Sequence, residues 1–120
     1  MEQFVKNEDG TVTDTKNGLV WSKSLAEDVN HSDALKAVAE LGEGWRLPTV
    51  DELLLIVDRT KYSPAADTEI FPDMESDWYW TSDKCAWNEE RRWVVSFNLG
   101  DVSYLLMSGY ACVRAVRASQ

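Results

Sequence analysis

The chain has 120 residues, enough for one domain, spanning residues 1–120, with a hydrophobic core of its own. Hydrophobic residues make up 44% of the chain, which disfavours disorder, and a formal net charge of -9 opposes direct contact with a nucleic-acid backbone. No apolar run approaches the ~18 residues that a membrane helix needs, so membrane insertion is not expected.

The first six residues, Met1–Lys6, lack a basic region followed by an apolar stretch, so no signal peptide is visible. We therefore favour a cytoplasmic or phage-associated location over secretion. The acidic residues are scattered along the chain, without an acidic tail, which is typical of a soluble surface. Attraction to a basic partner is the functional alternative.

The N-terminal part favours β-structure. Thr11–Asp14 and Leu19–Trp21 are short strand candidates. Between them lies Asn17-Gly18, a pair that accepts the positive φ angles of a tight turn. The sequence therefore predicts a β-hairpin across Asn17-Gly18.

Two helices are predicted next. Asn30 or Ser32 can cap the first, Gly42 follows it, and its apolar face comprises Leu35, Val38, Ala39 and Leu41. The second helix follows Pro48, where Thr49–Glu52 matches the capping box, in which a hydroxyl and a carboxylate satisfy free backbone amides reciprocally. The run Leu53–Val57 is apolar nearly all round, which predicts burial on more than one side.

The stretch Asp58–Asp77 is predicted to be an irregular loop, unusually long for a small domain and therefore a candidate functional segment. Strand candidates fill the last third of the chain: Trp78–Ser82, Arg92–Phe97, Val102–Met107 and Tyr110–Val116. Short turns join the last three, which predicts an antiparallel meander. The order of elements predicts the α+β class in one domain.

Several short motifs occur in a fixed order along nearly the whole chain. They are Asp9–Asp14, Gly18–Trp21, Gly44–Thr49 with Glu52-Leu53, Phe71-Pro72, Tyr79–Ser82, Val95–Phe97 with Gly100, and Val113–Arg117. In this order they resemble the C-terminal domain of bacterial collagen-like adhesins, the Lcl C-terminal domain. The Trp-Arg-Leu-Pro-Thr block at 45–49 and the closing Val-Arg-x-Val-Arg are the most specific parts.

The resemblance implies a C-type-lectin-like fold, in which two helices flank a twisted antiparallel sheet and a long loop carries ligand contacts. It also implies a role in adhesion, on a bacterial or phage protein. The chain is rich in tryptophan, with six. We assign Trp21, Trp45, Trp80 and Trp93 to the framework, because burial is the default for aromatic side chains.

Trp78 and Trp87 remain as candidates for ligand contact, since exposed aromatic rings stack on sugars and anchor protein partners. The full set of candidate ligand-binding residues is Trp78, Trp87, Asn88, Glu89, Arg91 and Tyr110. The run Trp87-Asn88-Glu89 resembles the Trp-Asn-Asp of calcium-dependent lectins. The Glu-Pro-Asn or Gln-Pro-Asp triplet that completes such a site is absent from the sequence, so we expect no bound metal.

No set of catalytic residues is apparent. Cys85 and Cys112 are too far apart in sequence for a Cys-x-x-Cys zinc site. They also do not stand in the closely placed pair of formylglycine-generating enzymes, which share the lectin-like fold. His31 is the only histidine, and a Ser-His-Asp arrangement cannot be argued around it. We therefore predict no enzymatic activity and no cofactor, and leave open whether the cysteines are free or bridged.

The sequence thus favours a non-enzymatic binding module that recognises a protein or a polysaccharide. We expect contact through the loop Tyr62–Asp77 and the hairpin region Ser82–Arg92. The alternative is a small acidic inhibitor, intracellular or phage-encoded, that blocks a basic, nucleic-acid-binding site on a partner protein. The oligomeric state is left open.

Overall fold

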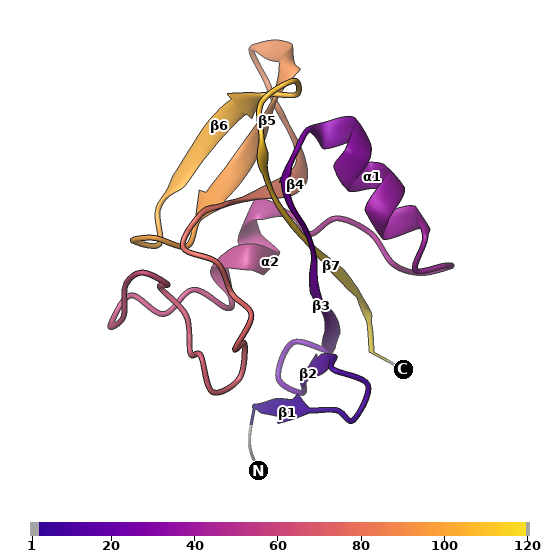
Figure 1. Cartoon of the computed structure of the whole chain (residues 1–120), viewed down its shortest axis with the longest axis vertical. Coiled ribbons are helices and arrows are strands. Elements are labelled where there is room, and N and C mark those ends of the chain that lie inside the picture. Colours follow the sequence, from indigo (N-terminus) through magenta and orange to yellow (C-terminus); the bar gives the residue numbers. More distant parts are fainter. Residues whose placement is uncertain (1–2, 120) are drawn as a thin grey trace.

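The computed structural model describes residues 3–119. Within them, one seven-stranded sheet is accompanied by two helices (Figure 1). The strands are β1 (Phe4–Lys6), β2 (Val12–Asp14), β3 (Leu19–Val29), β4 (Trp78–Cys85), β5 (Asn88–Ser96), β6 (Val102–Leu106) and β7 (Ala111–Ala118). The helices are α1 (His31–Ala39) and α2 (Val50–Leu54). The α+β class is therefore the one expected from the sequence.

The strands lie in the order β1-β2-β3-β7-β4-β5-β6. All neighbouring strands are antiparallel except β4 and β7, which are parallel and meet at Tyr79 and Cys112. The expected wholly antiparallel sheet is therefore wrong at this one junction. The hairpin predicted across Asn17-Gly18 is confirmed, because Asp14 of β2 pairs with Leu19 of β3.

The predicted C-terminal meander is wrong in its last step. Strand β7 does not return beside β6; it lies in the middle of the sheet, with its Leu19–Ala118 and Val29–Ala111 pairings to β3 at the two ends. The residues from Ala111 to Val116 are all buried, so β7 has apolar side chains on both faces. Such a strand is stabilised most in a central position, and this overrides the short preceding turn.

Two apolar clusters form the core. The first gathers α2 and the long loop against the sheet and comprises Trp21, Leu53, Ile56, Phe71, Met74, Tyr79, Val95 and Phe97, among others. The second gathers α1 and comprises Ala34, Val38, Leu47, Trp80, Val94, Val113 and Ala115, among others. Successive side chains of a strand point to opposite faces, which is why Tyr79 joins one cluster and Trp80 the other.

Helix α1 begins after Asn30, whose side chain accepts a hydrogen bond from the Asp33 amide, as expected for the cap. Its buried side chains are His31, Ala34 and Val38. The apolar face expected from the sequence is therefore wrong in part: Val38 is buried, but Leu35 is 50% exposed and Leu41 39% exposed. Ala34 is buried, and Leu35, the next residue and about 100° further around the helix, faces solvent.

Helix α2 begins with the predicted capping box, in which the Thr49 hydroxyl accepts from the Glu52 amide and the Glu52 carboxylate accepts from the Thr49 amide. Leu53 and Ile56 are buried and Leu54 and Val57 are half-buried, whereas Leu55 is 42% exposed, so one side of this run faces solvent. Neither helix in the described chain is long and apolar enough to cross a membrane.

The long segment between α2 and β4 is irregular, as expected, but it is held against the sheet. Phe71 and Met74 enter the first apolar cluster. The Asp58 amide donates to the Ala65 carbonyl, and the Ala65 amide donates to the Phe97 carbonyl. The loop is therefore part of the packed structure.

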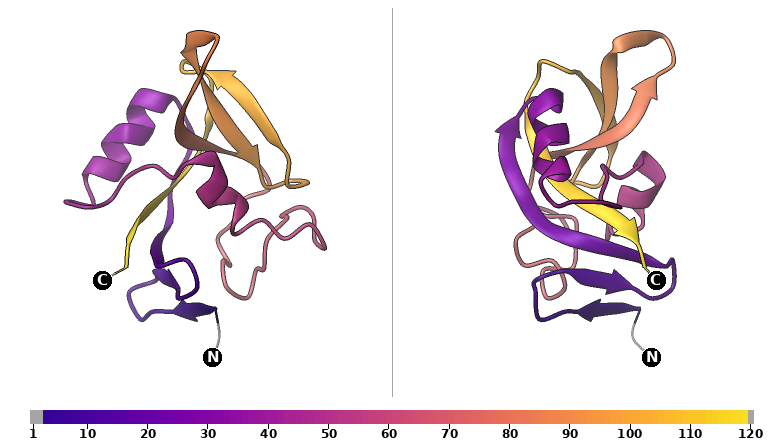
Figure 2. Two further views of the ribbon diagram at one scale, coloured as in Figure 1. Left: turned by 180° about the vertical axis from the view of Figure 1, so that it is seen from behind. Right: turned by 90° about the vertical axis from the view of Figure 1, so that its right-hand side faces the viewer.

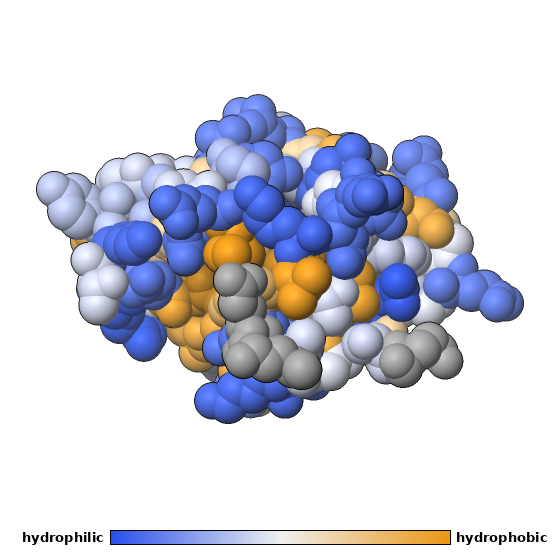
Figure 3. All heavy atoms as spheres, turned by 90° about the horizontal axis from the view of Figure 1, so that it is seen from below, coloured by the Kyte–Doolittle hydropathy of each residue, from blue (hydrophilic) through white to orange (hydrophobic). Residues whose placement is uncertain are grey.

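The two ends of the described chain both lie near the β2–β3 turn (Figures 1 and 2). The Thr15 amide donates to the Gln3 carbonyl, and the Ser119 amide donates to the Gly18 carbonyl at 2.8 Å. Seen from this end, the surface is mostly hydrophilic, with a group of apolar side chains near its centre (Figure 3). The β4–β5 hairpin lies at the opposite end of the molecule (Figure 1).

Candidate ligand-binding site

Three aromatic side chains, Trp87, Trp93 and Tyr104, contact one another around the β4–β5 hairpin; we call them the aromatic cluster. Their ring centroids are 5.6 Å apart for Trp87 and Trp93, 5.3 Å for Trp87 and Tyr104, and 5.9 Å for Trp93 and Tyr104. Trp93 and Tyr104 are register partners on β5 and β6, so they share one face of the sheet. Trp87 belongs to the two-residue turn after β4 and completes the group.

The aromatic cluster is open to solvent. Trp87 is 59% exposed and Tyr104 is 44% exposed, while Trp93 is half-buried beneath them. The Arg91 guanidinium lies 5.4 Å from the Tyr104 ring centroid, on the face shared with Trp93 two residues later. A cation over a ring face is attracted by the ring quadrupole, so Arg91 adds a fixed positive charge to the cluster.

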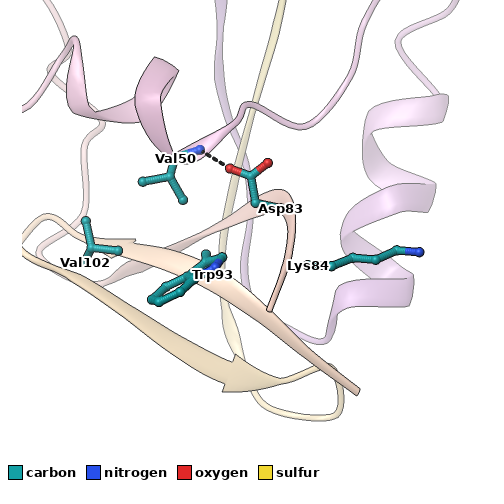
Figure 4. Close-up of a pocket in the computed structure, with 5 residues that line it drawn as sticks. All are labelled: Val50, Asp83, Lys84, Trp93 and Val102. Atoms are coloured by element: carbon teal, nitrogen blue, oxygen red, sulfur yellow. Dashed lines mark hydrogen bonds between the residues drawn. The ribbon is translucent and has the colours of Figure 1, made fainter. Parts of the chain in front are cut away.

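A cavity of about 410 Å³ adjoins the aromatic cluster. It is lined by Val50, Asp83, Lys84, Trp93 and Val102, so Trp93 belongs to both the cluster and the cavity wall (Figure 4). The Asp83 carboxylate accepts a hydrogen bond of 2.8 Å from the Val50 amide, which fixes the start of α2 against β4. The Lys84 side chain extends away from Val50, Trp93 and Val102 (Figure 4).

The structure brings four of the six predicted site residues to one hairpin. Trp87 is a member of the aromatic cluster, and Arg91 lies over the Tyr104 ring of that cluster. Asn88 follows this turn as the first residue of β5, and its side-chain oxygen accepts from the Glu90 amide at 2.9 Å. Glu89 is exposed, and its carbonyl accepts from the Arg92 guanidinium at 2.7 Å.

The other two predicted site residues lie elsewhere. Trp78 begins β4 and pairs with Ser96, so the length of the strand separates it from Trp87 by roughly 20 Å or more. Tyr110 is 66% exposed and comes immediately before β7. In residues 3–119, no ring contact joins either of them to the aromatic cluster.

Sequence reasoning missed Tyr104 and assigned Trp93 to the framework. The signal for Tyr104 is the alternation of Val102, Tyr104 and Leu106 along β6, which places three large side chains on one face. These residues are 38%, 44% and 42% exposed. Trp93 could not be placed from the sequence, because its neighbours Trp87 and Tyr104 come from two other segments.

The thiols and the histidine are buried in the framework, and Cys85 is the last residue of β4, just before the turn that carries Trp87. Cys85 and Cys112 are free and buried, so the disulfide left open by the sequence is not formed. Burial, with help from the nearby Asp77 carboxylate, raises the pKa of Cys112 to about 12. Burial lowers the pKa of His31, whose Nε2 lies 3.1 Å from the Thr81 carbonyl oxygen. No group of acidic, histidine or cysteine side chains in the described chain could hold a metal ion.

The architecture defines a class of protein. The structure is similar to the crystal structure of botrocetin, a C-type-lectin-like protein, with a TM-score of 0.53. That likeness covers 100% of this chain and 98% of the botrocetin chain at 10% sequence identity. It shows the C-type-lectin-like fold expected from the sequence.

The model of the Lcl C-terminal domain family matches residues 10–117. The chain belongs to the Lcl C-terminal domain family, which confirms the resemblance carried by the ordered motifs. No curated protein sequence matches the chain.

Proposed function

We propose that this chain is a non-enzymatic binding module that recognises a protein or a polysaccharide through the aromatic cluster, Arg91 and the adjoining cavity. One observation carries the proposal: three mutually supporting aromatic rings stand on an exposed face beside a cavity. Tryptophan, tyrosine and arginine are the side chains that dominate binding energy at interfaces.

The mutual ring contacts favour binding because they hold the side chains in place. Each pair of rings is nearly perpendicular, with interplanar angles of 81°, 87° and 88°. Edge-to-face pairs are a preferred geometry for aromatic rings. A surface that is already ordered loses little conformational freedom when a ligand binds, so more of the contact energy appears as affinity.

The same geometry limits how a ligand can bind. Because the rings are not coplanar, they do not form one flat platform along which several sugar rings could stack. Trp87 instead offers its exposed side to a single sugar ring or apolar side chain. The cavity of about 410 Å³ falls within the usual size range of ligand pockets, and two of its lining residues, Asp83 and Lys84, carry opposite charges.

The hairpin supports this role better than the long loop does. The large apolar side chains of the loop, Phe71 and Met74, are buried in the core. Tyr62 is 75% exposed, but it stands without ring partners among the described residues. We therefore place the main contact at the hairpin and give the loop a secondary contribution.

The test begins with two ligand panels, a glycan array and a displayed peptide library, each probed with the wild-type chain in calcium and in chelator. Any ligand found is then titrated against Trp87→Ala and Trp78→Ala. We expect Trp87→Ala to weaken binding about ten-fold or more, as for an interface hot spot, and Trp78→Ala to change it less than about two-fold.

Trp78→Ala is the matched control, because it removes an exposed tryptophan at the far end of β4. Circular dichroism confirms that both variants fold. A ligand whose affinity is unchanged by Trp87→Ala would refute the site. If neither panel yields a ligand, in calcium or in chelator, the proposed function is refuted.

A further inference from the structure

The two edge strands of the sheet differ in how they are protected from pairing with other chains. Strand β1 at one edge has three residues and ends in Lys6, the kind of short, charged edge that resists pairing. Strand β6 at the other edge has five residues, Val-Ser-Tyr-Leu-Leu, without charge or proline. Figure 1 and the left view of Figure 2 show β6 on the outside, with no strand or helix of the described chain beyond it.

The backbone of β6 has hydrogen-bonding groups available at this edge. The Met107 amide donates to the Glu90 carbonyl, and the Ser96 amide donates to the Asp101 carbonyl, so the odd-numbered positions face β5. In an antiparallel ladder these positions alternate with ones whose groups point outward. The N–H and C=O of Val102 and Tyr104 therefore point away from β5, and no strand of the described chain lies there to receive them.

The side chains of the same residues are also uncovered. Val102, Tyr104 and Leu106 share one face, and each is more than a third exposed. Free backbone groups and exposed apolar side chains on one strand are what an added β-strand requires. A surface of this kind on a monomer marks a site of association.

We propose that β6 pairs antiparallel with β6 of a second copy of this chain, about a two-fold axis that passes beside Tyr104. In this register Tyr104 faces Tyr104 of the second copy, and Val102 faces its Leu106. Apolar side chains therefore meet apolar side chains on both sides of the axis. Because the backbone groups of Tyr104 point outward, the two tyrosines exchange both hydrogen bonds of a ladder pair.

The charges around β6 suit this arrangement. Residues 102–110 carry no charge, so two chains of net charge -9 can meet here without apposing acidic side chains. Asp101 immediately precedes β6, while Arg91 and Arg92 lie across from Leu106 and Leu105 near its end. The two-fold axis brings the start of one strand to the end of the other, so Asp101 approaches the end that carries both arginines beside Glu90.

The proposed dimer has a consequence for the binding surface. A two-fold axis perpendicular to the sheet keeps the same face of both copies on the same side. The two aromatic clusters would then stand side by side on one continuous sheet. A polymeric or clustered ligand could engage both, and its second contact would be intramolecular.

The first test is the oligomeric state of the whole chain, measured by sedimentation velocity over about a hundred-fold range of concentration. The salt concentration should be about 0.15 M, where screening limits repulsion between the acidic copies. We expect a monomer–dimer equilibrium. Val102→Lys and Leu106→Lys should each weaken it about ten-fold or more, because lysine on an edge strand opposes pairing.

Leu55→Lys is the matched control, since Leu55 and Leu106 are both 42% exposed and only Leu106 lies on β6. We expect it to leave the equilibrium unchanged. A wild-type chain that stays monomeric over the whole range would overturn the proposal. A dimer that resists both β6 lysines would overturn it equally.

The second test fixes the register. Ladder partners have Cα atoms about 5.5 Å apart, within the range that a disulfide spans. Under mild oxidation, Tyr104→Cys should therefore form a covalent dimer, whereas Leu55→Cys should not. The native thiols do not compete, because Cys85 and Cys112 are buried. Equal cross-linking of the two variants would show random collision and would refute the two-fold pairing.

Discussion

Arg114 of the central strand β7 and Asp73 of the long loop form an ion pair, with Nη2 and Oδ1 2.5 Å apart. The Arg114 side chain is 1% exposed, and its Nη1 also donates to the Ser22 carbonyl. The second oxygen of Asp73 accepts from the Ser24 amide at 2.7 Å. One carboxylate therefore fastens the loop to β3 and β7 at once.

The first prediction is that Asp73→Asn destabilises the fold by about 2–3 kcal/mol, because the substitution leaves the buried guanidinium without its counter-charge. The value lies below that of a fully buried pair, since the Asp73 side chain is 40% exposed. Chemical denaturation measures it. The control is Asp67→Asn, whose ion pair with Lys61 is about half exposed, so its removal should cost less than about 0.5 kcal/mol. An equal loss of stability in the two variants would contradict the role of Asp73 as the partner of the buried Arg114.

The second prediction concerns how the stability of the fold changes as the pH falls. Burial lowers the pKa of His31 below its ordinary value of 6.5, so the unfolded chain takes up a proton before the folded chain does. Stability contributed by neutral His31 is therefore present above pH 6.5 and is lost as the pH falls through the lowered pKa. We expect the free energy of unfolding to decrease from about pH 7 to about pH 5. This decrease should shrink in His31→Gln; an identical pH profile would contradict it.

The third prediction concerns the thiols. Burial raises the pKa of both Cys85 and Cys112, and only the thiolate is reactive. Iodoacetamide should therefore modify neither cysteine in the native chain and both in denaturant, as mass spectrometry will show. Rapid native modification of Cys112, whose pKa is about 12, would contradict the structure.

The fourth prediction separates a framework role of Arg46 from a ligand role. Its guanidinium donates two hydrogen bonds, of 2.6 and 2.7 Å, to the Glu52 carboxylate, and these bonds hold the pKa of Glu52 below its usual value. Arg46→Lys keeps the charge but loses the two-point geometry. We expect a loss of about 1 kcal/mol in stability and unchanged affinity for any ligand found. A loss of affinity without a loss of stability would instead make Arg46 a contact residue.

The fifth prediction separates the proposed module from an acidic inhibitor of a basic site. Binding through the aromatic cluster depends mainly on ring burial and should weaken less than about three-fold between 0.05 and 0.5 M salt, as a rough expectation for a largely uncharged contact. The affinity of an electrostatic mimic would fall much more steeply over the same range of salt concentration. Titration of one ligand at several salt concentrations decides between them, and a steep decline would favour the inhibitor.

Local features were correctly predicted because their causes lie within a few residues of sequence. The Asn17-Gly18 turn supplies its own backbone geometry, and the Thr49–Glu52 capping box closes its own hydrogen bonds. Tyr79 and Trp80 are buried on opposite faces of the sheet, as the two-residue period of a strand requires. The same short-range reasoning failed for α1, where Ala34 rather than Leu35 faces the sheet.

The sequence by itself determined the α+β class, the order of the elements from β2 onward and, through its ordered motifs, the family; the short edge strand β1 was not predicted. Only the tertiary structure decided that β7 lies between β3 and β4, because that placement depends on burying both faces of one strand. The tertiary structure alone also brought Trp93 and Tyr104 to Trp87. A cluster assembled from a turn and two strands has no signature in any one of them, since its contacts exist only after the strands pair.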